Sequence, residues 1–389
     1  MIEASNLGRF IHQCRTDQKL TARRVESLVK ERGDLPRISE SHLLQIEKGR
    51  HFPRLDTCIA IAEVLSVPVN SLIEHCRRDI GAKADRPPPG TSWDALVRSA
   101  HKCMPNGDFH TALMFLRQAT ALLAEGETPI AEATAAMAEI RLTMAECYRA
   151  TGNLVGARDE LLMVLRDESL APALMRRALL NLTSIYRRMS DSVPARASAK
   201  MALELAEEAG DLVHQARATH CLGSLALERR VYPEALRRFR EAVNLFRKAG
   251  DERGAVITSL SAAVVSIEKR DYQIAIDSLK GLLVDITKLG DQKRLAEAHC
   301  ALGKALYRFG NRRGGMRHAE LAKQLADRGG YQHVLFMSLY YLWRIARDEK
   351  RPQLAAIHEK RLREVRRKLD DPLVEVTAFD REVDRRQDR

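Results

Sequence analysis

A repeat of about forty residues constrains the fold of this chain more than any other feature of its sequence. Glycines recur at that spacing, at Gly210, Gly250, Gly290 and Gly330. A second series of small residues marks the other half of each unit, namely Ala112, Ala157, Ala195, Ala235, Ala275, Gly315 and Ala355. Small residues at fixed positions let two helices pack closely. We therefore predict about seven helical hairpins, which bury their apolar faces only by stacking into an α-solenoid.

The composition favours helices along the whole chain. Only 5% of the 389 residues are aromatic, and Ala, Leu, Glu and Arg dominate over the β-branched residues. We expect an all-α protein of two or three domains. The net charge of +12 suggests an acidic partner such as DNA, RNA or an anionic surface. This support is weak, because residues 1 to about 80 carry nearly as many acidic as basic side chains.

The sequence shows no motif of a known catalytic or metal centre. The seven cysteines stand singly, without a C-x-x-C pair or a histidine at metal-ligand spacing. There is no Walker phosphate loop, G-x-G-x-x-G, H-E-x-x-H or G-x-S-x-G pattern. We expect a protein that is not an enzyme and that uses no metal and no cofactor. Because no signal peptide or long apolar span is visible, we expect a cytoplasmic protein with no membrane segment.

Residues 1–78 carry the pattern of five short helices. The evidence is apolar residues at helical spacing, separated by caps and breakers. The first helix carries the apolar residues Leu7, Phe10, Ile11 and Cys14, and Thr21 caps the second. Gly33 and Pro36 mark the loop before the third helix, which begins at the cap Ser39 and ends at Gly49. A fourth helix is expected from about Leu55 to Leu65, and a fifth contains Leu72 and Ile73. Within the third helix, Leu43 and Ile46 are expected to point inward.

This segment resembles the Cro/cI-type (XRE family) helix-turn-helix domain through "QIEKG", Pro53 and "IAEVL", in that order. The resemblance implies a five-helix, lambda-repressor-like fold whose third helix lies in the major groove of double-stranded DNA. It places Glu40, Ser41 and Gln45 at base-reading positions and Ser39 beside a phosphate. The alternative is an ordinary helical bundle whose polar side chains only face water.

Two departures from the family affect the expected docking on DNA. The loop before the third helix is several residues longer than usual. Ala22 and Glu26 also stand where many relatives carry a phosphate-binding Gln and a small Ala, so Arg23 or Arg24 is expected to supply that contact. The complete set of expected DNA-binding residues is Arg23, Arg24, Ser39, Glu40, Ser41, His42, Gln45, Lys48 and Arg50.

A proline-rich stretch at 79–92 is expected to be a linker of limited flexibility. The repeats of residues 93–389 resemble tetratricopeptide (TPR) repeats, most closely at Leu222, Gly223, Ala235, Phe239 and Ala242. The units run near forty residues rather than the usual thirty-four, which indicates a divergent array. This length is typical of peptide-sensing regulators and of helical signalling solenoids generally.

The TPR register implies that the first helix of each hairpin lines a concave groove. The charged and aromatic residues expected there are Arg149, Arg177, Arg187, Arg217, Lys304, Tyr307 and Arg344. Four of the arginines, Arg149, Arg177, Arg187 and Arg217, come from successive repeats and are suited to hold a carboxylate or an acidic peptide by paired hydrogen bonds. The alternative is that arginines of a basic chain simply fall on this face. The final run "KRLREVRRKLDD" is predicted to be a solvated last helix, with a capping or dimer surface as the alternative.

The resemblance as a whole implies a transcription regulator that binds double-stranded DNA through residues 1–78. The TPR-like sensor and oligomerisation domain is then expected to bind a peptide or protein effector and to form a homodimer. The alternative is a protein-interaction scaffold or adaptor in which the N-terminal bundle is a docking module. An enzyme or enzyme inhibitor acting through the groove has little support in the sequence.

Overall fold

The computed structural model describes residues 6–32, 36–51, 53, 55–67, 69, 72, 75, 91–125, 129–167, 170–367, 369 and 374–387. All the regular secondary structure in these residues is helical, in agreement with the all-α prediction. The chain divides into two compact units, Met1–Cys147 and Tyr148–Arg389. The predicted linker at 79–92 lies outside the described residues except for Thr91 and Ser92. Within the described part of the chain, no helix is both long and apolar enough to cross a membrane.

The N-terminal bundle contains four described helices: α1 (Asn6–Asp17), α2 (Ala22–Arg32), α3 (Glu40–Glu47) and α4 (Leu55–Val64). Their buried faces meet in one apolar core, to which Leu43 and Ile46 of α3 contribute as predicted. Leu72 is buried in the same core, but most of the expected fifth helix lies outside the described residues. Both predicted caps are present. The hydroxyl of Thr21 accepts a hydrogen bond from the Arg24 amide, and that of Ser39 accepts one from the His42 amide.

Helices α1 and α3 are joined by a buried ion pair that the sequence did not reveal. The Arg15 guanidinium donates from Nε to Glu47 Oε1 at 2.6 Å and from Nη2 to Oε2 at 2.9 Å. The two side chains are only 10% and 6% exposed. Burial raises the pKa of Glu47, but the hydrogen bonds from Arg15 and His12 outweigh it and bring that pKa below its ordinary value. A side chain at Gly8 would place its Cβ 2.3 Å from the Glu47 carbonyl oxygen, so glycine is required where the two helices meet.

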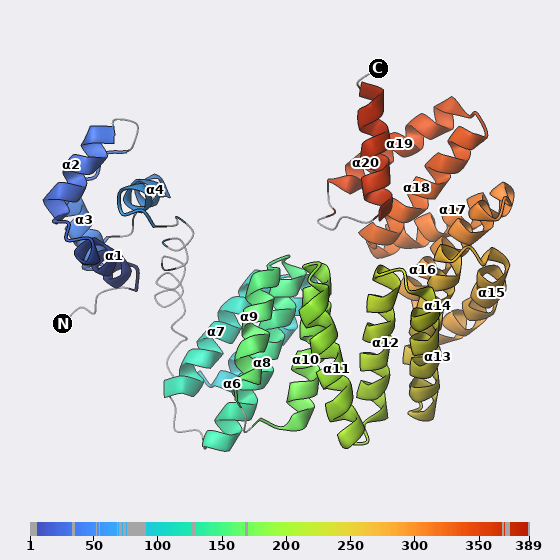
Figure 1. Ribbon diagram of the computed structural model, residues 1–389, viewed down its shortest axis with the longest axis horizontal. Helices are drawn as coiled ribbons and strands as arrows, with labels where there is room; N and C mark the ends of the chain where they lie inside the picture. The colour runs from blue at the N-terminus through green and yellow to red at the C-terminus, as the bar shows by residue number, and fades with distance from the viewer. Residues whose placement is uncertain are drawn as a thin grey trace. The chain divides into compact units, whose positions relative to one another are not determined.

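Within the described residues, the repeat region forms the fourteen helices that the seven predicted hairpins require (Figure 1). Their helices are α6 (Trp93–Cys103), α7 (Phe109–Glu125), α8 (Ile130–Ala150), α9 (Leu154–Leu165), α10 (Pro172–Arg188), α11 (Ser192–Glu208), α12 (Leu212–Glu228), α13 (Tyr232–Lys248), α14 (Glu252–Glu268), α15 (Tyr272–Leu289), α16 (Gln292–Arg308), α17 (Arg312–Gly329), α18 (Gln332–Asp348) and α19 (Pro352–Arg366). A short 3₁₀ turn, Met104–Asn106, follows α6.

Packing in the second unit places the first helix of each hairpin on the inner side of the stack. From α9 to α19, each helix contacts the next one along the chain. In addition, the first helices contact one another directly, in the pairs α10 with α12, α12 with α14, α14 with α16, and α16 with α18. The second helices make no comparable contacts in the described part of the chain. A stack with this asymmetry curves, and its first helices line the concave wall.

Each turn between the middle hairpins combines a left-handed glycine with an aspartate cap. Gly210, Gly250 and Gly290 have φ of 64°, 74° and 66°. The next residue in each case caps the following helix, as Asp251 does by accepting from the Gly254 amide at 2.8 Å. Asp211 and Asp291 are both caps as well, and each also pairs with an arginine of the preceding hairpin. These ion pairs are Arg176 with Asp211 at 3.1 Å and Arg253 with Asp291 at 2.8 Å.

The prediction that the basic run ends the protein as a solvated helix is wrong. Residues 360–366 of the run form the second half of α19, which buries Leu362 and Val365 in the core of the last hairpin. A further helix, α20 (Val374–Gln387), follows it. Val376 and Phe379 of α20 are buried, and the Phe379 ring meets the Trp343 ring edge-on at 5.3 Å. Helix α20 therefore covers the apolar end of the array.

Candidate functional site

The outer face of α3 carries the residues predicted to read DNA. Ser41, Gln45 and Lys48 are exposed, whereas Glu40 and His42 are half-buried. Ser39 and Arg50, which flank the helix, are exposed, as are Arg23 and Arg24 on α2. Because Leu43 and Ile46 anchor the opposite face in the core, the polar face cannot turn inward.

The start of α3 is fixed by a contact with α2. The Glu26 carboxylate accepts a hydrogen bond from the Glu40 backbone amide at 2.9 Å and another from Lys30 at 2.6 Å. These bonds from Lys30 and from the Glu40 amide lower the pKa of Glu26. A residue noted in the sequence as a departure from the family thus holds the N-terminus of α3 in place. Arg24 is engaged in an exposed ion pair with Glu31 at 2.9 Å, whereas Arg23 has no ion pair within the described residues.

The seven predicted groove residues fall into separate places along the inner wall. Arg187 of α10 pairs with Glu228 of α12 at 2.6 Å. Burial raises the pKa of the Cys221 thiol on α12, and the nearby cations Arg187 and Arg217 oppose that rise. Arg149 and Arg177 join neither this region nor the pocket described next; the Arg149 carbonyl accepts a hydrogen bond from Arg188.

The remaining three predicted residues, Lys304, Tyr307 and Arg344, come together near the end of the array. Tyr307 and Arg344 line a pocket of about 380 Å³ formed by α16, α17 and α18. Lys304 lies beside it, with its Nζ 5.9 Å from the centre of the Tyr341 ring and 2.7 Å from Glu268. The full lining of the pocket is Tyr307, Arg308, Gly310, Arg312, Tyr340, Tyr341, Arg344 and Asp348.

The chemistry of this pocket is aromatic and basic. Tyr340 and Tyr341 are 5% and 1% exposed, so they form a rigid wall rather than a mobile surface. The Tyr307 hydroxyl donates to Asp348 at 2.8 Å, and burial together with this bond raises the pKa of Tyr307. The hydroxyl therefore stays protonated at neutral pH. Three guanidinium groups face one carboxylate, which suits the pocket to an anionic group.

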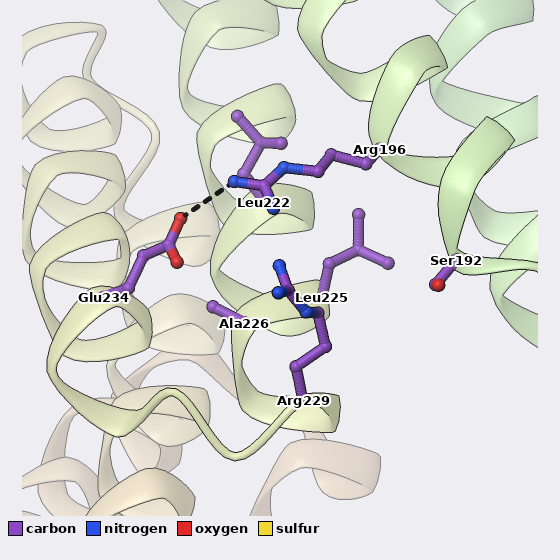
Figure 2. Close-up of a pocket in the computed structure, with 7 residues that line it drawn as sticks. All are labelled: Ser192, Arg196, Leu222, Leu225, Ala226, Arg229 and Glu234. Atoms are coloured by element: carbon purple, nitrogen blue, oxygen red, sulfur yellow. Dashed lines mark hydrogen bonds and ion pairs between the residues drawn. The ribbon is translucent and has the colours of Figure 1, made fainter.

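A second cavity lies between α11, α12 and the start of α13 (Figure 2). Arg196 and Arg229 extend over a floor that includes Leu222 and Leu225, and Arg196 pairs with Glu234 at 3.5 Å. Its volume is about 20 Å³, which is the space for one water molecule. This notch is too small for a peptide side chain, so the pocket at Arg344 is the better candidate site.

Sequence reasoning missed Arg308, Arg312, Tyr341 and Asp348 in this pocket. The TPR register assigns only positions on the inner face of first helices, whereas Arg308 and Asp348 lie at helix ends and Arg312 begins a second helix. The available signal was the run "YRFGNRR", in which two aromatic residues and three arginines surround a turn. In the described residues, no group of three or more His, Cys, Asp or Glu side chains is placed to hold a metal ion.

The stacked hairpins with inner first helices define the class of the second unit as a TPR-like α-solenoid. The chain is similar in structure to aspartyl phosphate phosphatase F from Bacillus subtilis, with a TM-score of 0.59, 12% identity, and coverage of 97% of this chain and 96% of that chain. It is also similar to a Rap protein solved in complex with competence and sporulation factor, with a TM-score of 0.55, 14% identity, and coverage of 76% and 87%. A third similar structure is the apo form of RapI, with a TM-score of 0.53, 14% identity, and coverage of 72% and 77%.

At these identities the likeness establishes the fold of the solenoid. Sequence comparison finds no family model and no curated protein that matches the chain. The helix-turn-helix resemblance of the N-terminal bundle therefore rests on its own residues and on the geometry of α3.

Proposed function

We propose that this protein is a sequence-specific DNA-binding transcription regulator whose TPR-like array binds a peptide or protein effector and mediates homodimerisation. The outer face of α3 carries the first part of this proposal. Ser41 and Gln45 project from a helix that is capped at Ser39 and anchored by its buried face, which is the arrangement needed to present polar groups to base edges. The protein acts by binding rather than by catalysis.

Two observations support effector binding by the array. The first helices form a continuous inner wall, and the wall holds the aromatic and basic pocket at Arg344. A Rap protein of similar fold was solved in complex with competence and sporulation factor, so this architecture accommodates a bound factor in that case. Dimerisation has a physical motive, because one helix-turn-helix contacts few base pairs and two half-sites multiply specificity.

A scaffold or adaptor is the second candidate. It is supported by the likeness to aspartyl phosphate phosphatase F, which covers 97% of this chain and so extends beyond the solenoid to the N-terminal residues. Weak binding to DNA without sequence preference, together with a small dependence on salt, favours the scaffold.

Selection of bound sequences from a random duplex pool by the full-length protein tests the proposal. At near-physiological salt, we expect enrichment of a palindrome whose half-sites lie about one helical turn apart. An unenriched pool at several protein concentrations contradicts sequence-specific binding and leaves the scaffold as the better account.

The selected sequence then provides the probe for α3. We expect the double variant Ser41→Ala, Gln45→Ala to lose preference for it, because each lost base contact costs about 1–3 kcal/mol of discrimination. Non-specific, salt-dependent binding should remain. The matched control is Gln13→Ala, which removes an exposed amide from α1. Retained selectivity in the double variant would show that α3 is not the reading helix.

A further inference from the structure

The pocket at Arg344 holds more positive charge than its own acids balance. The lining carries Arg308, Arg312 and Arg344. Burial opposes the charge of Arg308, but Tyr341, which is close enough for a side-chain hydrogen bond, and the electrostatic attraction of Glu268 both raise the pKa of Arg308. Asp348 is the single acid of the lining, and it already accepts a hydrogen bond from Tyr307. A cavity whose lining carries three guanidinium groups and one carboxylate favours an anion, because the summed charge of the lining is positive.

Arg344 is shared between the pocket and α20. Its Nη1 lies 3.4 Å from Glu382 Oε2, and Glu382 also contacts Arg347. The Glu382 carboxylate does not line the pocket; it approaches Arg344 from the helix that covers the end of the array. One lining cation of the pocket is therefore held by a carboxylate of the chain itself.

Helix α20 fixes Glu382 in this position through separate contacts. Its Val376 and Phe379 are buried against the last hairpin, and Asp380 pairs with Arg366 at 3.2 Å. The Glu382 contact with Arg344 is long, and the Arg344 side chain is still 39% exposed. Such a contact is weak enough for an incoming carboxylate to replace it.

We propose that this pocket binds a carboxylate of the effector, using Arg308, Arg312 and Arg344, and that Glu382 of α20 competes with that carboxylate for Arg344. The inference rests on the proposed effector-binding function and adds the chemical group recognised and its internal competitor. The volume of about 380 Å³ accommodates an acidic residue packed against Tyr340 and Tyr341. A bidentate bond from a guanidinium to a carboxylate supplies both the charge and the geometry.

Two sources of carboxylate, an acidic side chain and a peptide C-terminus, are separated by three probes. Acetyl-tetraglutamate amide has only side-chain carboxylates, acetyl-tetraglutamine has only the terminal one, and acetyl-tetraglutamine amide has neither. Each is titrated into the full-length protein by calorimetry at low salt. We expect one or both carboxylate-bearing probes to bind and the fully neutral probe not to bind. Equal binding of all three, or binding of none, overturns the proposal.

Variants then locate the site with the probe that binds. Arg312→Ala should weaken its binding about tenfold, since a charge-assisted hydrogen bond is lost. Arg313→Ala is the matched control, because it removes the neighbouring exposed arginine that does not line the pocket. Equal effects of the two changes contradict the site. So does a loss confined to Arg177→Ala and Arg217→Ala, which would place the anion in the middle of the groove.

The competition is tested on α20. Glu382→Gln should tighten binding of the same probe severalfold, because Arg344 is released. Asp380→Asn removes the neighbouring carboxylate that pairs with Arg366 instead, and should leave binding unchanged. Equal tightening by both variants would mean that loosening α20 is sufficient and would overturn competition through Glu382. These outcomes are independent of the DNA selection, so the regulator proposal and this inference can fail separately.

Discussion

At the turns of the array, one backbone dihedral decides which residue is tolerated at little cost. Gly210, Gly250 and Gly290 supply the left-handed conformation between hairpins, where a side chain is unfavourable. Within the hairpins the same conformation is taken by Arg230 and Arg270, with φ of 59° and 73°. The glycine series was therefore visible in the sequence, whereas the arginine turns gave no signal, because arginine is common in ordinary helices.

Two glycine variants separate backbone strain from helix propensity. We expect Gly250→Ala to destabilise the array by about 1 kcal/mol, because alanine must adopt the left-handed conformation although no neighbouring atom blocks it. Gly281→Ala should stabilise by about 0.5–1 kcal/mol, since Gly281 lies exposed within α15 and its added methyl group meets nothing. Urea unfolding followed by circular dichroism measures both. Changes of the same sign would refute this explanation.

His299 and His318 form a close imidazole pair whose Nδ1 atoms are 3.0 Å apart. Burial, aided by the neighbouring His318, lowers the pKa of His299 from 6.5 to about 4. Between about pH 6.5 and about pH 4, His299 is protonated in the unfolded chain but stays neutral in the folded protein. The free energy of unfolding is therefore not reduced by His299 above this range, and it falls as the pH is lowered through the range.

The thermal midpoint of the array should accordingly fall more steeply in the wild type than in His299→Asn between about pH 7 and about pH 5. The control is His333→Asn, which removes an exposed histidine of α18 and should keep the wild-type slope. Thermal scans at fixed ionic strength provide the measurement. Identical slopes for all three proteins would remove His299 as a source of the pH dependence.

Among the helices of the N-terminal bundle, the contact between α1 and α3 depends on the buried pair of Arg15 and Glu47. Removing one partner leaves the other charge buried, so Glu47→Ala should cost about 3–5 kcal/mol. The double change Arg15→Met, Glu47→Leu should recover most of that loss, because a buried ion pair can often be replaced by apolar side chains. Hydrogen exchange of the α1 and α3 amides in the full-length protein measures the loss of stability in the single variant and its recovery in the double variant. Equal protection in the single and double variants would contradict a buried unpaired charge as the cause.

The elements of the bundle and of the hairpins were largely predictable because their signals are local. Caps at Thr21 and Ser39 and the inward residues Leu43 and Ile46 follow from spacing within one helix. Helix α20 was missed because its few apolar residues, such as Val376 and Phe379, have meaning only against the end of the array. The ion pair between Arg15 and Glu47 was missed because it joins α1 to α3, and the sequence does not show how these two helices approach each other.

For the whole molecule, the number of hairpins was predictable because each repeat packs mainly on its neighbours, so self-similarity in sequence becomes stacking in space. The register also brought Lys304, Tyr307 and Arg344 to one end of the wall. The complete pocket was not predictable, because Arg308, Arg312 and Asp348 converge from helix ends. Their distance apart depends on the angle between hairpins, which the repeat alone does not encode.

The joints at Asp211 and Asp291 have a consequence for how such an array changes length in evolution. Each aspartate caps the helix that follows it and also forms an ion pair with an arginine of the hairpin before it. One residue therefore both starts a new hairpin and bonds it to the preceding one. Duplication or loss of the segment between these two turns, which spans two repeats, rejoins two equivalent turns. Whole repeats are therefore the natural unit of insertion and deletion, whereas a partial unit would leave both a helix start and an inter-hairpin bond unmade.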